Sequence, residues 1–333
     1  MLFIISEAQV KTMVFIKILF TFFKIIHPFY KMINYMNEPF KSCTFVDRVF
    51  VEWYHLPRKT VLKEVLTMKI TAVVENTSCR DDIGAEHGLS IYVKTKSHNL
   101  LFDVGKTDLF LKNAQTLGID IGGIDTLIIS HGHYDHGGGL SAFLEHNKKA
   151  KIYISEHAFL EYFAKNDRYI GLDQSLKNNP RFIFTKDELR LDDELYLFSG
   201  NNLPRDENGA TANLYIKQNG EMKEDQFLHE QYLIITEDDK SVAISGCSHK
   251  GIINVSKWCE RFSPNAIIGG FHFMEVAVDE CGENLIKNTS KTLLKNGAMF
   301  YTCHCTGLSQ YELFSKYMGQ KIDYLSAGKT IEI

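Results

Sequence analysis

The chain has 333 residues and a formal net charge of −4, with 44% hydrophobic and 23% charged residues. These ordinary globular values exclude a mainly disordered chain, a collagen-like repeat and a multi-span membrane protein. The charge is uneven, because residues 1–67 carry nine Lys/Arg against five Asp/Glu and the rest of the chain is acidic. An acidic body argues against nucleic acid as a partner, since phosphate binding requires clustered Lys and Arg.

The composition divides the chain into an apolar, basic N-terminal extension at 1–67 and one domain at 68–333. Residues 13–26 are apolar but contain Lys17 and Lys24, and they fall short of the roughly 20 apolar residues that span a bilayer. A helix there would present a basic stripe to anionic lipid. A tail that packs locally or is disordered is the favoured interpretation. A further alternative is that the native protein starts at Met68.

From Met68 onwards, strand and helix patterns mix in both halves of the chain, which predicts an α/β layered domain. The predicted strands, in chain order, are 69–74, 89–95, 100–104, 124–129, 151–154, 232–236, 241–245, 266–268, 298–302, 323–325 and 330–333. The predicted helices are 109–117, 140–146, 155–164 with Ser155 as N-cap, 251–262, 284–295 and a last helix opened by a Ser309/Glu312 capping box.

The cysteines show no disulfide framework. Their number is odd, and no CxxC pair is present among Cys43, Cys79, Cys247, Cys259, Cys281, Cys303 and Cys305. A reducing environment and a cytoplasmic location are therefore predicted, and a structural zinc knuckle is not.

The strongest chemical signal is the run SHGHYDHGGG at 130–139, directly after the predicted strand 124–129. It holds four potential ligands within six residues, namely His131, His133, Asp135 and His136. Imidazole and carboxylate suit zinc and similar divalent metals, and a loop at the carboxyl end of a strand can turn them into one cleft. A His-rich surface loop is the alternative, but this density of ligands favours a metal site.

Three more histidines follow predicted strands and are expected at the same edge of a sheet. They are His249, His272 and His304. The other histidines lack this placement and are given no role: His27, His55, His98, His146, His157 and His229.

From about Met68 to Ile333 the chain resembles the metallo-β-lactamase superfamily, and within it the dihydropterin-linked subgroup that includes a synthase joining a dihydropterin methyl group to ribofuranosyl-aminobenzene phosphate. The motifs that carry the resemblance are ENTS at 75–78, EHGLS at 86–90, FDVG at 102–105, the 131–139 cluster, GCSHKGIIN at 246–254, GGFH at 269–272 and HCTG at 304–307.

The resemblance implies a four-layer αββα sandwich with two divalent metal ions at one rim. One ion would be held by His131, His133 and His249, and the other by Asp135, His136 and His304. Asp103 matches an acid that braces the ligand loop. Diiron relatives have Glu at the position of His133, so zinc is favoured, with manganese as an alternative.

The chain departs from the superfamily where many members use a bridging Asp, because His272 stands at that place. An imidazole cannot bridge as a carboxylate does, so either a hydroxide alone bridges the metals, or the second metal binds weakly, or His272 has a role of its own. The last alternative is favoured, and His272 is predicted to act in acid/base chemistry, to substitute as a ligand or to contact substrate. Glu86 and His87 are candidate substrate contacts or loop braces. Cys247, Cys303 and Cys305 are expected to be buried fillers.

The predicted function is a metal-dependent enzyme acting on an anionic, pterin-like or phosphorylated small molecule, by dihydropterin-methyl transfer with release of diphosphate. One alternative is a hydrolase of esters, phosphodiesters or thioesters that uses a metal-bound hydroxide. Another is a non-catalytic metal-binding sensor.

Overall fold

The computed structural model describes residues 67–205 and 213–333. The extension at 1–67 lies outside these residues apart from Thr67, so the division at 67/68 stays a prediction, and so does membrane contact by 13–26. Within the described ranges, no helix has the length and apolar character needed to cross a membrane.

Two seven-stranded mixed sheets form the centre of the domain. The first sheet has the order β18 (Thr330–Glu332), β1 (Lys69–Val74), β2 (Ser90–Lys94), β3 (Asn99–Phe102), β4 (Thr126–Ile128), β5 (Lys151–Ser155) and β8 (Phe182–Thr185). The second has the order β17 (Ile322–Tyr324), β16 (Met299–Thr302), β15 (Ala266–Gly269), β14 (Lys240–Ile244), β13 (Tyr232–Glu237), β10 (Leu195–Phe198) and β9 (Glu188–Arg190).

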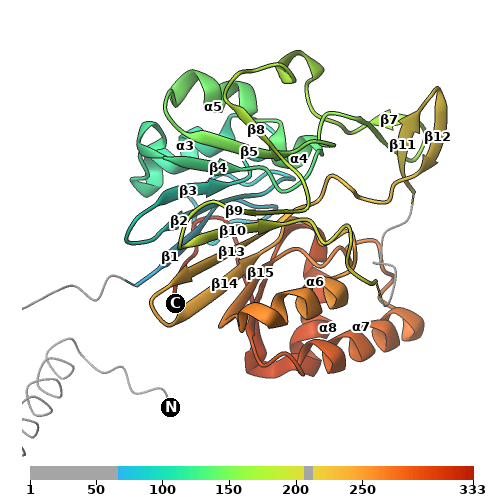
Figure 1. Cartoon of the computed structure of the whole chain (residues 1–333). Helices are drawn as coiled ribbons and strands as arrows, with labels where there is room; N and C mark the ends of the chain where they lie inside the picture. The colour runs from blue at the N-terminus through green and yellow to red at the C-terminus, as the bar shows by residue number, and fades with distance from the viewer. Residues whose placement is uncertain (1–66, 206–212) are drawn as a thin grey trace, which may run out of the picture. The chain divides into compact units, whose positions relative to one another are not determined.

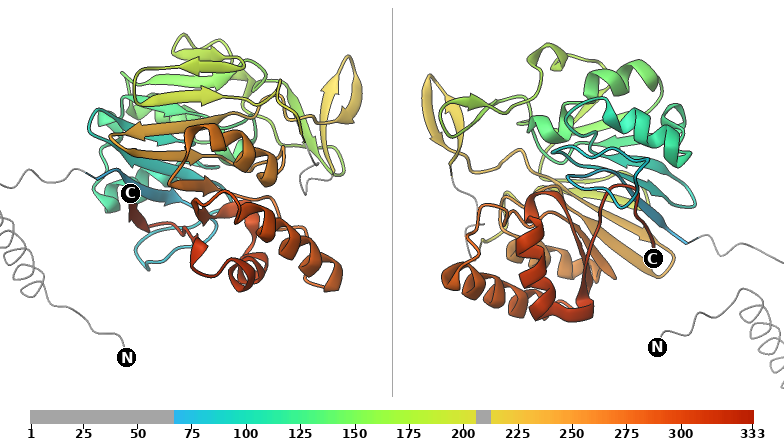
Figure 2. Two further views of the ribbon diagram at one scale, coloured as in Figure 1. Left: turned by 60° about the horizontal axis from the view of Figure 1, so that its bottom comes forward. Right: turned by 180° about the vertical axis from the view of Figure 1, so that it is seen from behind.

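Helices cover the outer face of each sheet (Figures 1 and 2). The first sheet carries α3 (Leu109–Leu117), α4 (Tyr134–Gly137) and α5 (Leu140–His146), and the second carries α6 (Ile252–Cys259), α7 (Glu280–Leu293) and α8 (Leu308–Met318). Short 3-10 turns occur at Ile121–Gly123, Gln174–Leu176, Glu260–Phe262, His304–Thr306 and Gly319–Lys321. The four-layer αββα sandwich expected from the sequence is confirmed.

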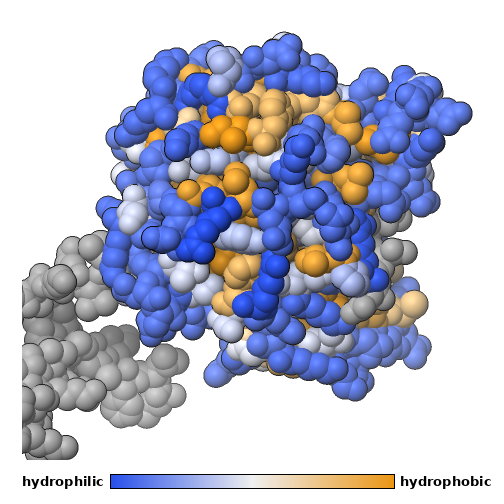
Figure 3. All heavy atoms as spheres, viewed as in Figure 1, coloured by the Kyte–Doolittle hydropathy of each residue, from blue (hydrophilic) through white to orange (hydrophobic). Residues whose placement is uncertain are grey.

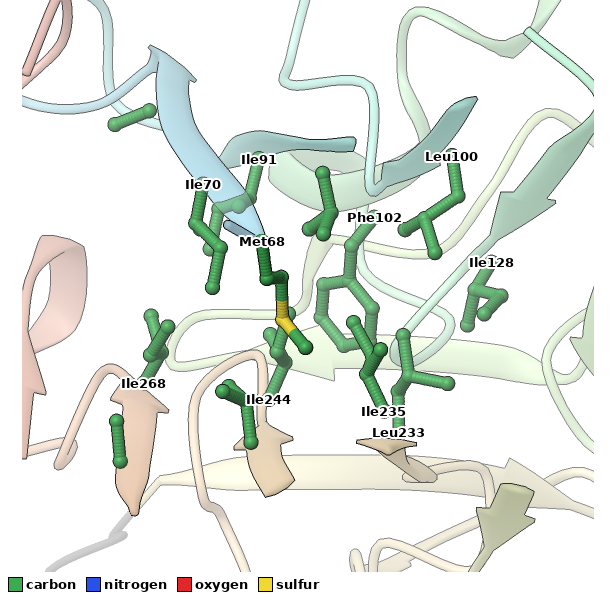
Figure 4. Packing of buried hydrophobic residues seen from close by; sticks show 14 of the residues in the cluster. Met68, Ile70, Ile91, Leu100, Phe102, Ile128, Leu233, Ile235, Ile244 and Ile268 are labelled. Atoms are coloured by element: carbon green, nitrogen blue, oxygen red, sulfur yellow. The ribbon is translucent and has the colours of Figure 1, made fainter. Parts of the chain in front are cut away.

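Alternation along the strands explains the layers, because successive side chains point to opposite faces of a sheet. In β13, Leu233 and Ile235 join the core between the sheets, while Tyr232 and Ile234 pack in the core beneath the helices of the second sheet. Figure 4 shows side chains of the two sheets directed toward each other, with Phe102 among those of the first sheet. The central core therefore consists of one face of each sheet.

A small third sheet has the order β12 (Glu221–Glu224), β11 (Leu214–Gln218), β6 (Glu161–Ala164) and β7 (Arg168–Tyr169).

The predicted helix at 155–164 is wrong, because part of this segment forms strand β6 of the third sheet. Ser155 ends β5, and residues 161–164 pair with β11, about 50 residues further along the chain. The buried side chains of Tyr162 and Ala164 alternate with more exposed ones, so a distant partner decides the conformation of this segment.

The predicted capping box of Ser309 and Glu312 is also wrong. Helix α8 begins at Leu308, with Gly307 as N-cap, two residues before the predicted cap, and has no side-chain cap. Gly307 has φ 81°, and because this left-handed conformation favours glycine, the helix start is fixed by the backbone rather than by a serine hydroxyl.

The face shown in Figure 3 is mostly hydrophilic, with one larger hydrophobic area in its upper part and smaller groups elsewhere. The loops that follow β3, β4, β14, β15 and β16 matter more for function. Because β3 pairs in parallel with β4, and β15 in parallel with both β14 and β16, these strands bring their carboxyl ends to one edge of each sheet. At these strand ends lie the motifs at 102–105, 131–139, 246–254, 269–272 and 304–307.

Candidate metal centre

The first donor set consists of His131, His133 and His249, whose ligating atoms all lie within 4.8 Å of one another. Nε2 of His131 lies 3.2 Å from Nε2 of His249, and the rings of His131 and His133 have centroids 4.5 Å apart. All three side chains are buried. Two loops that are more than 100 residues apart in the chain, after β4 and β14, supply this set.

The second donor set consists of Asp135, His136 and His304. Nε2 of His304 lies 3.2 Å from Nε2 of His136 and 3.3 Å from Oδ2 of Asp135, and the same carboxylate oxygen lies 3.8 Å from Nε2 of His136. The two sets are neighbours, because the ring centroids of His131 and His136 are 4.1 Å apart. The structure thus brings together the six residues named as ligands from the sequence.

Hydrogen bonds direct the lone pairs of three histidines into the centre. Ser130 Oγ donates to Asp103 and so accepts from His131 Nδ1, at 2.8 Å. Nδ1 of His136 donates to Asp103 at 2.6 Å, and Nδ1 of His304 donates to the side-chain oxygen of Asn76 at 2.8 Å. With the proton on Nδ1, each Nε2 is left as an acceptor, which is the form that binds a metal.

His133 provides a separate test of whether a cation fits. Its Nε2 is buried and has no hydrogen-bond partner within the described ranges. A buried polar atom without a partner is costly in a protein interior. A divalent ion held by the first donor set would give this nitrogen a partner, so the residues present suit a metal.

A buried carboxylate holds the backbone of each ligand loop. Asp103 accepts from the amide of Ser130 at 2.7 Å, next to His131. Glu75 accepts from the amide of His304 at 2.6 Å, and Glu230 from the amide of His249 at 2.7 Å. These three acids therefore fix the paths of the loops, and Asp103 also fixes the tautomer of His136.

Replacing Asp103 with Asn tests this support. One amide oxygen cannot accept from the Ser130 amide, the Ser130 hydroxyl and the His136 ring as the carboxylate does. We expect unfolding free energy to fall by about 1–3 kcal/mol and zinc affinity of the second donor set to fall by about 10–100-fold. Chemical denaturation and zinc titration measure the two effects. Asp120→Asn, at an exposed position, is the control, and equal losses in both variants would contradict the role of Asp103.

Sequence reasoning gave no role to His229, which is buried beneath the first donor set. Its Nδ1 accepts from the amide of Gly132, between His131 and His133, so its Nε2 carries the proton and donates to Asp225 at 2.9 Å. Glu230 is a second residue that was missed. The polar triplet HEQ at 229–231, directly before the apolar strand β13, was the available signal.

Glu86 and His87, the two candidate substrate contacts, lie in different surroundings. His87 lies at the second donor set, with Nε2 3.3 Å from Oδ2 of Asp135. The carboxylate of Glu86 instead accepts from the amides of Lys106 and Thr107, each at 3.0 Å. It therefore braces a loop and borders an open hollow of about 880 Å³ beside α3, which is separate from the donor atoms.

His272 lies beside His249 of the first donor set. Its ring centroid is 4.4 Å from that of His249, and the side chain is partly buried. Its predicted roles stay predictions.

Cys247 was expected to be a filler, but its Sγ lies 3.2 Å from Nε2 of His136. The sulfur of Cys247 therefore lies among the donor atoms, within 4.8 Å of ligating atoms of His131 and His136.

Acid is expected to destabilise the metal-free protein. Burial lowers the pKa of His133 from 6.5 to about 3 and that of His304 to about 4, and it also lowers those of His131 and His249. The unfolded chain therefore binds more protons than the folded chain between pH 6.5 and about 3–4, and each pH unit in this window costs about 1.4 kcal/mol per histidine.

His136 acts above this window. Burial lowers its pKa, but Asp103 and Asp135 outweigh that effect and raise it, so its stabilisation develops as the pH falls from that raised pKa to 6.5 and is complete below 6.5. Burial also raises the pKa of the Asp103 carboxyl, which offsets part of the loss. The four histidines with lowered pKa values still give a net loss of stability as the pH falls from 6.5 to about 4. Denaturant melts of chelator-treated protein across this range measure the loss, and a free energy of unfolding that is flat or rises on acidification would contradict it.

Comparisons with known proteins agree with this geometry. The family profile described as the metallo-beta-lactamase superfamily matches residues 83–248. A Methanocaldococcus jannaschii protein named 7,8-dihydropterin-6-methyl-4-(beta-D-ribofuranosyl)-aminobenzene-5'-phosphate synthase is 30% identical over 278 residues, covering 74% of this chain and 90% of the relative. An uncharacterized protein of the same organism is 28% identical over 271 residues, covering 79% of this chain and all of the relative.

The structural comparison points the same way. A crystal structure described as a metal-dependent hydrolase of the β-lactamase superfamily is 32% identical, with a TM-score of 0.68, and the match covers 80% of this chain and 99% of that one. The αββα fold, the two donor sets at its rim and these relatives together show that the chain belongs to the metallo-β-lactamase superfamily of metal-dependent enzymes.

Proposed function

We propose that the protein is a binuclear metalloenzyme that transfers a dihydropterin-methyl group to an aromatic acceptor and releases diphosphate. The observation that carries the binuclear part is the pair of adjacent donor sets, whose rings at His131 and His136 are 4.1 Å apart. The choice of reaction is supported by the synthase-named relative, of which this chain covers 90%. Bound divalent ions would supply Lewis-acid stabilisation of the charge on the departing diphosphate.

Two histidines beside the donor sets are our candidates for the group that accepts a proton. His87 is half exposed, and its ring centroid lies 4.9 Å from that of His304. His272 lies beside His249 at the other set. When the acceptor carbon or amine bonds to the pterin methylene, it loses a proton, which one of these imidazoles accepts. The methylene–oxygen bond breaks at the same time, and its electron pair leaves with the diphosphate.

Two cations next to the ligand loop support an anionic small-molecule substrate. Arg168 Nη1 lies 3.5 Å from the hydroxyl of Tyr134, and Lys106 Nζ lies 5.7 Å from the centre of the same ring. Tyr134 lies between His133 and Asp135 in the chain, and both cations are exposed. Guanidinium and ammonium groups suit a phosphate or diphosphate, and an isolated pair of this kind does not suit nucleic acid.

Hydrolysis of an ester or phosphodiester is the second candidate, with water in place of the aromatic acceptor. The similarity to a structure described as a metal-dependent hydrolase supports it. The same donor sets and the same flanking histidines would serve both reactions, so only the nucleophile separates them.

An assay of metal-depleted protein resupplied with zinc or manganese distinguishes the candidates. For the transferase, release of diphosphate from a dihydropterin-methyl diphosphate should require a ribofuranosyl-aminobenzene phosphate acceptor, and mass spectrometry should detect the joined product. Turnover of bis-p-nitrophenyl phosphate without an acceptor, abolished by His131→Ala, would favour the hydrolase. Binding of two metals without turnover of any substrate would contradict both and support a sensor.

A further inference from the structure

Cys247 and His249 lie on one loop, after β14, but face different donor sets. His249 belongs to the first set, whereas Sγ of Cys247 lies 3.2 Å from Nε2 of His136 in the second. The Cys247 side chain is buried, with the residue 3% exposed. Gly246 permits this approach, because a Cβ there would lie 2.3 Å from Oγ of Ser130 and collide with the neighbouring ligand loop.

The spacing of the donors fits tetrahedral coordination. Bonds of about 2.0–2.1 Å to N or O and about 2.3 Å to S place the ligating atoms of a tetrahedral zinc site roughly 3.3–3.6 Å apart. Nε2 of His136 lies 3.2 Å from both Nε2 of His304 and Sγ of Cys247, and Oδ2 of Asp135 lies 3.3 Å from the His304 nitrogen. Sγ of Cys247 also lies within 4.8 Å of ligating atoms of His304 and of His131.

We propose that Cys247 is the fourth protein ligand of the second metal, which its thiolate would bind. The second site then contains Asp135, His136, His304 and Cys247. Metal binding displaces the thiol proton, so one proton per chain passes to the solvent. This proposal depends on a second metal, as in the proposed function, but on neither proposed reaction.

The neighbouring thiols differ from Cys247 in their contacts. Sγ of Cys305 lies within 4.8 Å of ligating atoms of Cys247 and His304, but it donates to the backbone oxygen of Cys247 at 3.6 Å and so supports the loop. Cys303 is buried in the core between the two sheets. Among these three cysteines, only Cys247 has a described contact below 3.5 Å between its sulfur and a histidine nitrogen of the second donor set, that of His136.

A thiolate also decides between the metals that the sequence left open. Sulfur ligands select zinc and other soft or borderline ions, whereas manganese and magnesium prefer oxygen ligands. We therefore expect the second site to retain zinc when both ions are present, and to lose this preference in Cys247→Ser.

Cobalt substitution tests the proposal without any substrate. The cobalt(II) protein should show a near-ultraviolet thiolate-to-cobalt charge-transfer band. Cys247→Ser should lose this band and bind its second metal at least about tenfold more weakly, while the visible bands of the first set remain. Cys305→Ser is the matched control and should keep the charge-transfer band.

A wild-type protein without the band, or a band that survives Cys247→Ser, would overturn the proposal. If Cys247→Ser does not fold, X-ray absorption of the wild-type protein loaded with two zinc ions replaces it. A zinc–sulfur distance of about 2.3 Å supports a thiolate ligand, and a shell of nitrogen and oxygen alone overturns it. Because these measurements involve no turnover, their failure is separate from a failure of the transferase or hydrolase assay.

Discussion

His131→Ala is expected to lower the zinc affinity of the first donor set, and turnover with it, by more than about 100-fold. Replacing a residue that only supports a metal ligand already lowers metal affinity or activity by about 10–100-fold, and His131 is itself a ligand. His131 is central in the structure. Its Nε2 lies 3.2 Å from that of His249, and its ligating atom belongs to donor groups with His133 and with His136. Removing its ring leaves two histidines that cannot hold the ion alone. Competition with a chromophoric chelator measures the affinity.

His146→Ala is the matched control for this substitution. His146 is exposed at the end of α5, and its ring nitrogen bonds only to the backbone oxygen of Ala142 among the interactions described. Zinc affinity and turnover should be unchanged in this variant. Two tightly bound zinc ions per chain in His131→Ala would contradict the composition of the first donor set.

Removal of metal is expected to have the largest effect on stability. An ion that binds only the folded chain, at a free concentration of 1,000 times its Kd, stabilises that chain by about 4 kcal/mol per site. For a domain of this size each kcal/mol shifts Tm by roughly 2–4 °C, so loss of both ions should lower Tm by more than about 15 °C. Thermal denaturation over a series of buffered zinc concentrations measures this shift.

The form of the zinc dependence carries further information. Tm should rise with the logarithm of free zinc above each Kd, and His131→Ala should lose part of that rise. Asp120→Asn, which is remote from the donor atoms, should follow the wild-type curve. A Tm that is independent of free zinc would contradict the fit between the buried histidines and a metal.

Local sequence patterns predicted those elements and ligands that depend only on residues nearby in the chain. The alternation at 69–74 and the helical spacing at 109–117 gave elements with the bounds that the structure has. The ligand cluster at 131–136 was found because four donors follow one strand within six residues. His249 and His304 were added because they also follow strand ends, and parallel strands bring such ends together.

The remaining features depend on partners far away in the chain. Residues 161–164 form a strand because they pair with β11, which no local pattern shows. Glu75 binds the amide of His304 and Glu230 that of His249, so their roles appear only once the loops have met. Asp103, His272 and His304 have positive φ values of 63°, 59° and 50°, and this uncommon backbone conformation leaves no trace in the sequence.

The pairing of β1 with β18 has a consequence for biosynthesis. The hydroxyls of Thr71 and Thr330 lie 2.8 Å apart across this pair although 259 positions separate them in the chain. At a synthesis rate of 5–20 residues per second, the ribosome delivers β18 roughly 13–50 s after β1. His304 likewise follows His136 by 168 positions. The nascent chain therefore carries an incomplete second donor set, and one unpaired edge of β1, for much of its synthesis, when metal ions and chaperones can already reach both.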